Sequence, residues 1–130
     1  HAVPSVEYTL PEIAVTGLSK TEAESQGMDV HVSKFPWAAS GRAASLGEKT
    51  GVTQLITDKN TSRILGLGIV GPEAGELISE GTLAIEMAAL AEDVALTIHP
   101  HPTLSETVQE AAELALGQSL HFYTKKSRGG

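Results

Sequence analysis

Cysteine is absent from this chain of 130 residues. Its absence excludes a disulfide framework, a thiolate metal site, a cysteine nucleophile and a redox-active cysteine pair within the chain. Positive charge is also scarce, because 9 Lys and Arg stand against 16 Asp and Glu, which gives a net charge of −7. Non-specific binding to nucleic acids or anionic membranes needs a positive surface, so we expect neither as a partner.

Long apolar runs are missing as well. No stretch approaches the roughly 18 consecutive apolar residues of a membrane span. The first ten residues, HAVPSVEYTL, lack the basic and apolar regions of a signal peptide. These absences favour a cytoplasmic protein. What is present is an ordinary globular composition, 41% hydrophobic, in a length that fits one domain, with a basic end at 125–130 that we expect to be frayed.

Strand-forming sequence dominates the first half of the chain. Short runs rich in β-branched and aromatic residues predict strands at 3–9, 30–35, 51–57 and 63–70. The last two runs are separated by DKNTS, which is typical turn sequence, so they predict a hairpin. The Ala- and Gly-rich residues 36–47 predict a loop with a helical turn.

Helical signals dominate the second half, after one short helix predicted at 20–26 by a capping box and a following glycine. Pro72 begins a helix that continues to about residue 89, because proline suits the first helical position. A shorter helix is predicted at 92–96, and the last is predicted from 104 to 116, ending at Gly117. Strands followed by helices predict an α+β fold, a central antiparallel sheet with its helices packed to one side.

Motifs for nucleotide or metal binding are weak. There is no Gly-x-Gly-x-x-Gly and no P-loop, and the glycines of 66–71 lie within a predicted strand instead of at a strand-to-helix turn. His99 and His101 suggest a metal-binding pair, but Pro100 and Pro102 hold them in a stiff loop. No spacing signature marks a third or fourth ligand. We therefore expect no metal site.

His101 and Glu106 are the strongest candidates for chemistry. His101 lies just before a predicted helix and Glu106 in its first turn, so the helix can fold the carboxylate back towards the imidazole. Such a carboxylate favours the protonated ring and fixes its tautomer, which suits general acid–base catalysis. The structural alternative is that TLSE at 103–106 is only a capping box, in which Glu106 reaches back to the Thr103 amide.

The segment IHPHPTLSE at 98–106 resembles the C-terminal signature of dihydrolipoamide dehydrogenases, which are members of the flavin-disulfide reductase family. Other segments resemble the same family in the same order: VEYTLPEIAVTGLSKTEAESQG, then FPWAASGRA as in Gram-negative bacterial members, then GVTQLITDKNTSRILGLGIVGPEAGELI. The similarity covers roughly residues 3–118. We therefore take residues 1–118 as the domain and 119–130 as a C-terminal tail.

This resemblance implies the interface, or dimerisation, domain of a bacterial dihydrolipoamide dehydrogenase that works as a homodimer. It implies that His101, paired with Glu106, takes a proton from dihydrolipoamide on a lipoyl domain of a 2-oxo acid dehydrogenase complex. The thiolate then attacks a redox disulfide, and electrons pass through FAD to NAD+. It also implies that His101 and Pro102 contact the flavin of the opposite subunit and that the peptide bond between them is cis. His99 receives no chemical role.

The chain departs from that family in one large respect. The FAD domain, the NAD domain and the redox cysteine pair are missing from it, so we expect no bound cofactor and no reductase activity from the chain alone. Contacts with a second copy are expected at Gly75, Leu77, Ile78 and one face of the last helix.

Two other interpretations are open. One is a stand-alone dimerisation or interaction module without catalysis, and the other is the same domain of a sibling disulfide reductase such as a glutathione reductase. His1 in place of Met favours a piece of a longer chain over a stand-alone module. Leu104 and the preceding residues 98–100 favour the lipoamide branch.

Overall fold

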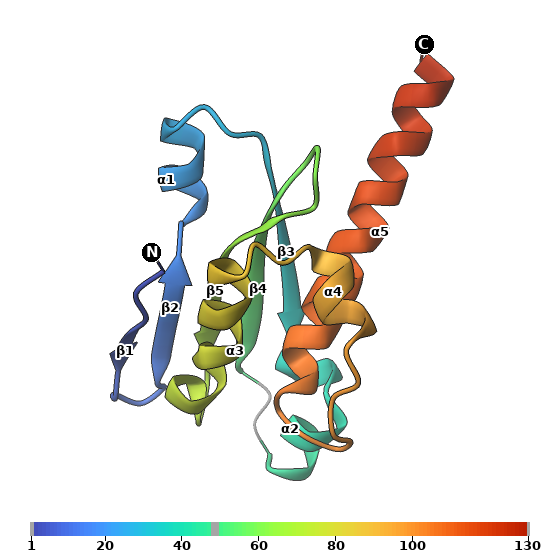
Figure 1. Ribbon diagram of the computed structural model, residues 1–130. Coiled ribbons are helices and arrows are strands. Elements are labelled where there is room, and N and C mark those ends of the chain that lie inside the picture. Colours follow the sequence, from blue (N-terminus) through green and yellow to red (C-terminus); the bar gives the residue numbers. More distant parts are fainter. Residues whose placement is uncertain (1, 48–49, 130) are drawn as a thin grey trace.

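The computed structural model describes residues 2–47 and 50–129, and the side chains of these residues except those of 44 and 119–129. His1 lies outside the described residues. Five strands form one antiparallel sheet in the order β1-β2-β5-β4-β3 (Figure 1). The strands are β1 Ser5–Glu7, β2 Ile13–Gly17, β3 Val30–Pro36, β4 Val52–Asp58 and β5 Ile64–Val70. The helical elements are α1 Lys20–Ser25, the 3-10 turn η1 Trp37–Ala39, α2 Gly41–Ser45, α3 Ala74–Glu86, α4 Ala91–Leu96 and α5 Glu106–Gly129.

The α+β class and the central antiparallel sheet are confirmed. The predicted hairpin is the pair β4 and β5, and the helical turn expected at 36–47 is formed by η1 and α2. The first predicted strand is shorter than expected, and β2 was not predicted. The two strands pair through Ser5 opposite Val15, so the chain reverses direction between them.

The prediction that the last helix ends at Gly117 is wrong. It begins at Glu106, two residues later than expected, and continues to Gly129. Gly117 does not have the positive φ of a helix-ending glycine. A glycine inside a helix costs only about 1 kcal/mol relative to alanine, which is too little by itself to end a helix. The expected boundary between residues 118 and 119 thus lies inside a continuous helix (Figure 1).

The two long helices cover the same face of the sheet. Leu55 of β4 lies directly opposite Leu67 of β5, so their side chains point to the same face, and Thr53 joins them because side chains alternate along a strand. On this face α3 approaches so closely that a Cβ on Gly81 would meet the Leu67 side chain. Thr107 of α5 is hydrogen-bonded to Thr53, which places α5 on the same side.

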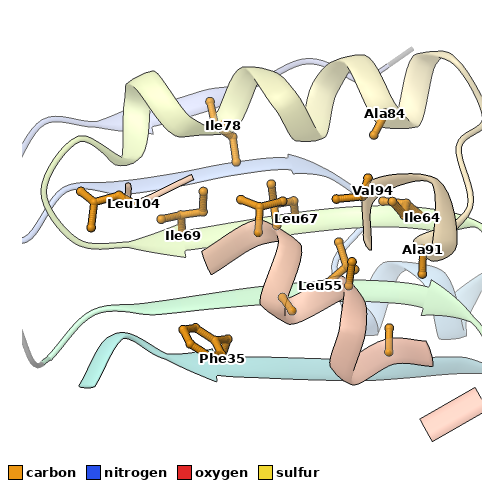
Figure 2. Packing of buried hydrophobic residues seen from close by; sticks show 14 of the residues in the cluster. Phe35, Leu55, Ile64, Leu67, Ile69, Ile78, Ala84, Ala91, Val94 and Leu104 are labelled. Carbon is orange, nitrogen blue, oxygen red and sulfur yellow. The ribbon is translucent and has the colours of Figure 1, made fainter. Parts of the chain in front are cut away.

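The hydrophobic core fills the space between this face and the helices (Figure 2). Ile78 of α3 is 1% exposed and belongs to this core. Its expected role in contacting a second copy is therefore wrong, because its side chain already packs inside its own chain. The exposed apolar side chains here are Leu83 of α3, at 64% of its full exposure, and Met87 directly after the helix, at 73%.

A chain of buried hydrogen bonds joins the sheet to the first turn of α5. The Thr107 hydroxyl donates to the Leu104 carbonyl oxygen at 2.8 Å, which uses its only proton. The Thr53 hydroxyl therefore donates to Thr107 Oγ1 at 2.8 Å. Thr53 Oγ1 in turn accepts from Trp37 Nε1 at 2.9 Å. Every polar side-chain group in this series of hydrogen bonds has a partner, as burial of polar atoms requires.

Replacing Thr53 with Val tests this chain. Thr53→Val keeps the shape of the side chain but leaves the buried Trp37 N–H without its acceptor, so we expect a loss of about 1–3 kcal/mol in the free energy of unfolding. Urea denaturation followed by Trp37 fluorescence measures it. Thr53→Ser is the matched control, because it keeps the hydroxyl and removes only a methyl group. A valine variant that is as stable as the serine variant would contradict the account.

Candidate functional site

The candidate site lies on the loop between α4 and α5, residues 97–105, at one end of the sheet (Figure 1). Two prolines stiffen this loop, and the peptide bond between His101 and Pro102 is cis, as the resemblance implied. A second cis bond joins Leu10 to Pro11 and was not expected. The His101 side chain keeps 78% of its exposure, so the loop presents the imidazole to solvent.

The structure brings His101 and Glu106 together. His101 Nδ1 lies 3.0 Å from Oε1 and 3.0 Å from Oε2 of Glu106. An ionised carboxylate only accepts hydrogen bonds, so Nδ1 carries the proton and donates it. In the neutral ring the lone pair is then on Nε2. This arrangement leaves an exposed histidine with its proton-accepting nitrogen directed away from its carboxylate partner.

Glu106 also fills the capping role that was the structural alternative. Its Oε1 accepts a hydrogen bond from the Thr103 backbone N–H at 2.9 Å. The other half of the expected box does not form: the Glu106 N–H donates to the Thr103 carbonyl oxygen at 3.3 Å, and the Thr103 hydroxyl donates to the Pro100 carbonyl oxygen at 2.6 Å. The Thr103 N–H first, and the His101 hydrogen bond second, hold the pKa of Glu106 below its ordinary value. The carboxylate therefore stays ionised and keeps orienting His101.

A cavity of about 210 Å³ adjoins the pair. Besides His101 and Glu106, its lining comes from β3, the η1–α2 segment and the first turns of α5: Phe35, Ala39, Ser40, Gly41, Thr107 and Glu110. Burial, followed by the charges of Glu113 and Glu106, raises the pKa of Glu110. Glu110 was not among the residues predicted from the sequence. Its position one helical turn after Glu106 is the signal in the sequence that could have marked it. No local signal connects Ser40 and Gly41 with this loop.

A second cavity, of about 700 Å³, lies elsewhere, and none of its described lining residues belongs to the loop at 97–105. It is bordered by the N-terminal segment, α1 and the end of α3, with Arg63, Glu22 and Glu86 among its residues. Its described lining residues include no histidine and none of the residues that the sequence singled out for chemistry.

His99, which the sequence left without a role, is tied to α3. Its Nε2 lies 2.6 Å from Oε2 of Glu80, and its Nδ1 lies 2.8 Å from the Thr97 carbonyl oxygen. The two histidines of the loop thus contact different carboxylates and do not converge on one point. Among the residues whose side chains the structure describes, no three metal-binding side chains gather as a metal site requires. The same residues hold no helix long and apolar enough to cross a membrane.

The chain is thus an antiparallel sheet with helices on one face, and it presents a hydrogen-bonded histidine–glutamate pair at its surface. The pyridine nucleotide-disulphide oxidoreductase dimerisation domain, as a family, matches residues 3–112 of the chain. The chain belongs to this family.

Curated relatives agree with this assignment. The chain is 56% identical over 115 residues to the dihydrolipoyl dehydrogenase of Buchnera aphidicola, which covers 88% of the chain and 24% of that protein. It is 53% identical to that of Haemophilus influenzae, over 97% of the chain and 26% of that protein. It is 52% identical to the dihydrolipoyl dehydrogenase of Thermus scotoductus, over 95% of the chain and 27% of that protein. The chain therefore spans about a quarter of the length of these relatives.

Solved structures show the same fold. LpdA from Mycobacterium tuberculosis superposes with a TM-score of 0.81 at 25% identity, over 85% of this chain and 24% of that one. The HOCl-induced flavoprotein disulfide reductase RclA from Escherichia coli gives a TM-score of 0.82 at 26% identity, over 87% of this chain and 26% of that one.

The opposite pKa shifts of Glu106 and Glu110 predict how stability depends on pH. The pKa of Glu106 lies below its ordinary value of 4.5 in the folded chain, so its carboxylate stabilises the fold above that pH and this contribution is lost as the pH falls through the folded pKa. Glu106→Gln should therefore flatten the loss of thermal stability below about pH 4.5.

Glu110→Gln is the matched comparison, because the pKa of Glu110 is shifted in the opposite direction. The pKa of Glu110 is raised in the folded chain, so its ionisation costs stability as the pH rises above its ordinary value of 4.5. Removing that charge should make the chain more stable than the parent at neutral pH. Thermal unfolding of both variants across the acid range measures how the melting temperature changes with pH. If the melting temperatures of Glu106→Gln and the parent fall equally with decreasing pH, the lowered pKa of Glu106 is refuted.

Proposed function

We propose that this chain is the interface domain of a dihydrolipoamide dehydrogenase and that it supplies His101 and Glu106, across a homodimer, for the NAD-dependent oxidation of dihydrolipoamide in the cytoplasm. The observation that carries the proposal is the hydrogen bond from His101 Nδ1 to the ionised Glu106, which leaves the exposed Nε2 as the proton acceptor. Relatives named dihydrolipoyl dehydrogenase at 47–56% identity support the lipoamide branch over a sibling reductase.

The chemistry of this chain is the transfer of one proton. A thiol of dihydrolipoamide, carried on a lipoyl domain, approaches the exposed edge of His101, and Nε2 accepts its proton as the nucleophilic thiolate forms. The imidazolium that results has both N–H groups, and Glu106 stabilises it through the existing Nδ1 contact. Because Glu106 also accepts from the Thr103 backbone, the carboxylate does not rotate away when His101 changes charge.

The cavity beside His101 is too small to enclose a cofactor. Its family is one of FAD- and NAD-dependent reductases, but the cavity beside His101, about 210 Å³, is smaller than the roughly 300–1,000 Å³ typical of sites for small molecules and cofactors. His101 and Pro102 are both exposed, so they are suited to contact a flavin that another surface holds. Leu83, on the outside of α3, and Met87, directly after this helix, offer an apolar surface for the second copy.

Replacing His101 in the full-length enzyme tests the acid–base role. His101→Gln should lower turnover of dihydrolipoamide by about 10²–10⁴-fold, the usual contribution of a general base, while the flavin remains bound. Steady-state kinetics and the flavin absorbance spectrum measure the two effects. Glu92→Gln, an exposed carboxylate on α4, is the control and should keep parental turnover. Near-parental turnover in His101→Gln would refute the proposal.

Mixed dimers test whether the base acts across the subunit boundary. One parent carries His101→Gln and the other lacks its redox cysteines, so each homodimer should be inactive. If His101 serves the opposite subunit, random exchange should restore about a quarter of parental activity, because half of the dimers are mixed and one of their two sites is complete. If His101 serves its own subunit, the mixture stays inactive, and the trans arrangement is wrong.

A further inference from the structure

The loop that carries His101 is attached to the fold by its side chains. In the part of the chain that the structure describes, no backbone-to-backbone hydrogen bond involves residues 98–102. Pro100 and Pro102 have no N–H to donate. On the C-terminal side of the loop, Glu106 of α5 binds His101 and the Thr103 amide. A second attachment is therefore needed on the other side if the position of His101 is to be fixed.

His99 provides that attachment to α3. Its side chain is only 5% exposed, whereas that of His101 is 78% exposed. Nε2 lies 2.6 Å from Oε2 of Glu80, and Nδ1 lies 2.8 Å from the Thr97 carbonyl oxygen. A buried imidazole with a short contact at each nitrogen is held in one orientation, unlike an exposed surface histidine.

The two contacts also fix the protons. The Thr97 carbonyl only accepts, so Nδ1 of His99 carries a proton and donates it. The 2.6 Å contact with the Glu80 carboxyl needs a second proton between Nε2 and Oε2. Without that proton, two lone pairs would face each other at this distance. The pair therefore holds the loop through a short hydrogen bond between His99 Nε2 and Glu80 Oε2.

We propose that His99 and Glu80 are a positioning pair, which fixes the loop at 97–105 on α3 so that His101 presents Nε2 to the dithiol in one place. The inference rests on the function proposed for His101. With this pair, the loop is anchored on its N-terminal side to α3, which packs on β2 and β5, and on its C-terminal side to α5, which packs on β3 and β4. Neither His99 nor Glu80 touches the substrate in this account.

Variants of the full-length enzyme test the positioning pair. His99→Ala and Glu80→Ala should each lower kcat for dihydrolipoamide by about 10- to 100-fold, because a displacement of about 1 Å costs up to that much. KM should stay within about twofold. Electron transfer from NADH to ferricyanide, which bypasses the dithiol, should be unchanged. The double variant should be no slower than either single one, since both remove the same contact.

Glu80→Gln separates positioning from simple structural damage. Its amide N–H can donate to Nε2 of a neutral His99 while Nδ1 keeps its bond to Thr97, so the loop stays attached and kcat should recover to within about twofold of the parent. Glu76→Ala, an exposed carboxylate one turn earlier on α3, is the control and should behave as the parent.

Each result has one meaning. Parental kcat in His99→Ala and Glu80→Ala overturns the inference, and so does a loss of ferricyanide reduction equal to the loss of dithiol turnover, which marks general damage. Glu80→Gln that is as slow as Glu80→Ala also overturns it. If His101→Gln itself keeps full turnover, the proposed function fails. If His101→Gln is inactive but the two alanine variants are not, only the positioning role fails.

Discussion

The buried hydrogen bonds from Trp37 through Thr53 and Thr107 to the Leu104 carbonyl determine where the candidate site lies. Each hydroxyl has only one proton to donate, so these hydrogen bonds can run in only one direction if every group is to have a partner. It fixes the first turn of α5 against β4 from the inside. Glu106 sits in that turn, between Leu104 and Thr107, and the position of its carboxylate therefore follows from the core.

The chemistry of the loop depends on that fixed carboxylate. Glu106 accepts hydrogen bonds from the Thr103 backbone N–H and from His101 Nδ1 at once, and both bonds lower its pKa and keep it ionised. The same carboxylate of Glu106 therefore caps the helix at Thr103 and orients the His101 ring. The imidazole remains exposed, as the proposed transfer of a proton from a thiol requires.

Local signals in the sequence were sufficient for much of the fold and for part of the site. The hairpin of β4 and β5 follows from a turn sequence between two β-rich runs, and the contact of His101 with Glu106 follows from a spacing of five residues across a helix start. The β2 strand is short and follows a proline, so its pattern was too brief to predict. The contact of His99 with Glu80 spans 19 residues and two helices, and nothing local to either residue marks it. Gly117 resembles a helix-ending glycine, but it lacks the backbone conformation that ends a helix.

The central claim is that Glu106 holds His101 in the tautomer with the proton on Nδ1, which leaves Nε2 as the base. Nitrogen-15 NMR of the imidazole rings in this 130-residue chain, at a pH where His101 is neutral, measures the tautomer directly. The account predicts a protonated Nδ1 and an unprotonated Nε2 for His101, with the preference lost in Glu106→Ala. A His101 ring that carries its proton on Nε2 would contradict it.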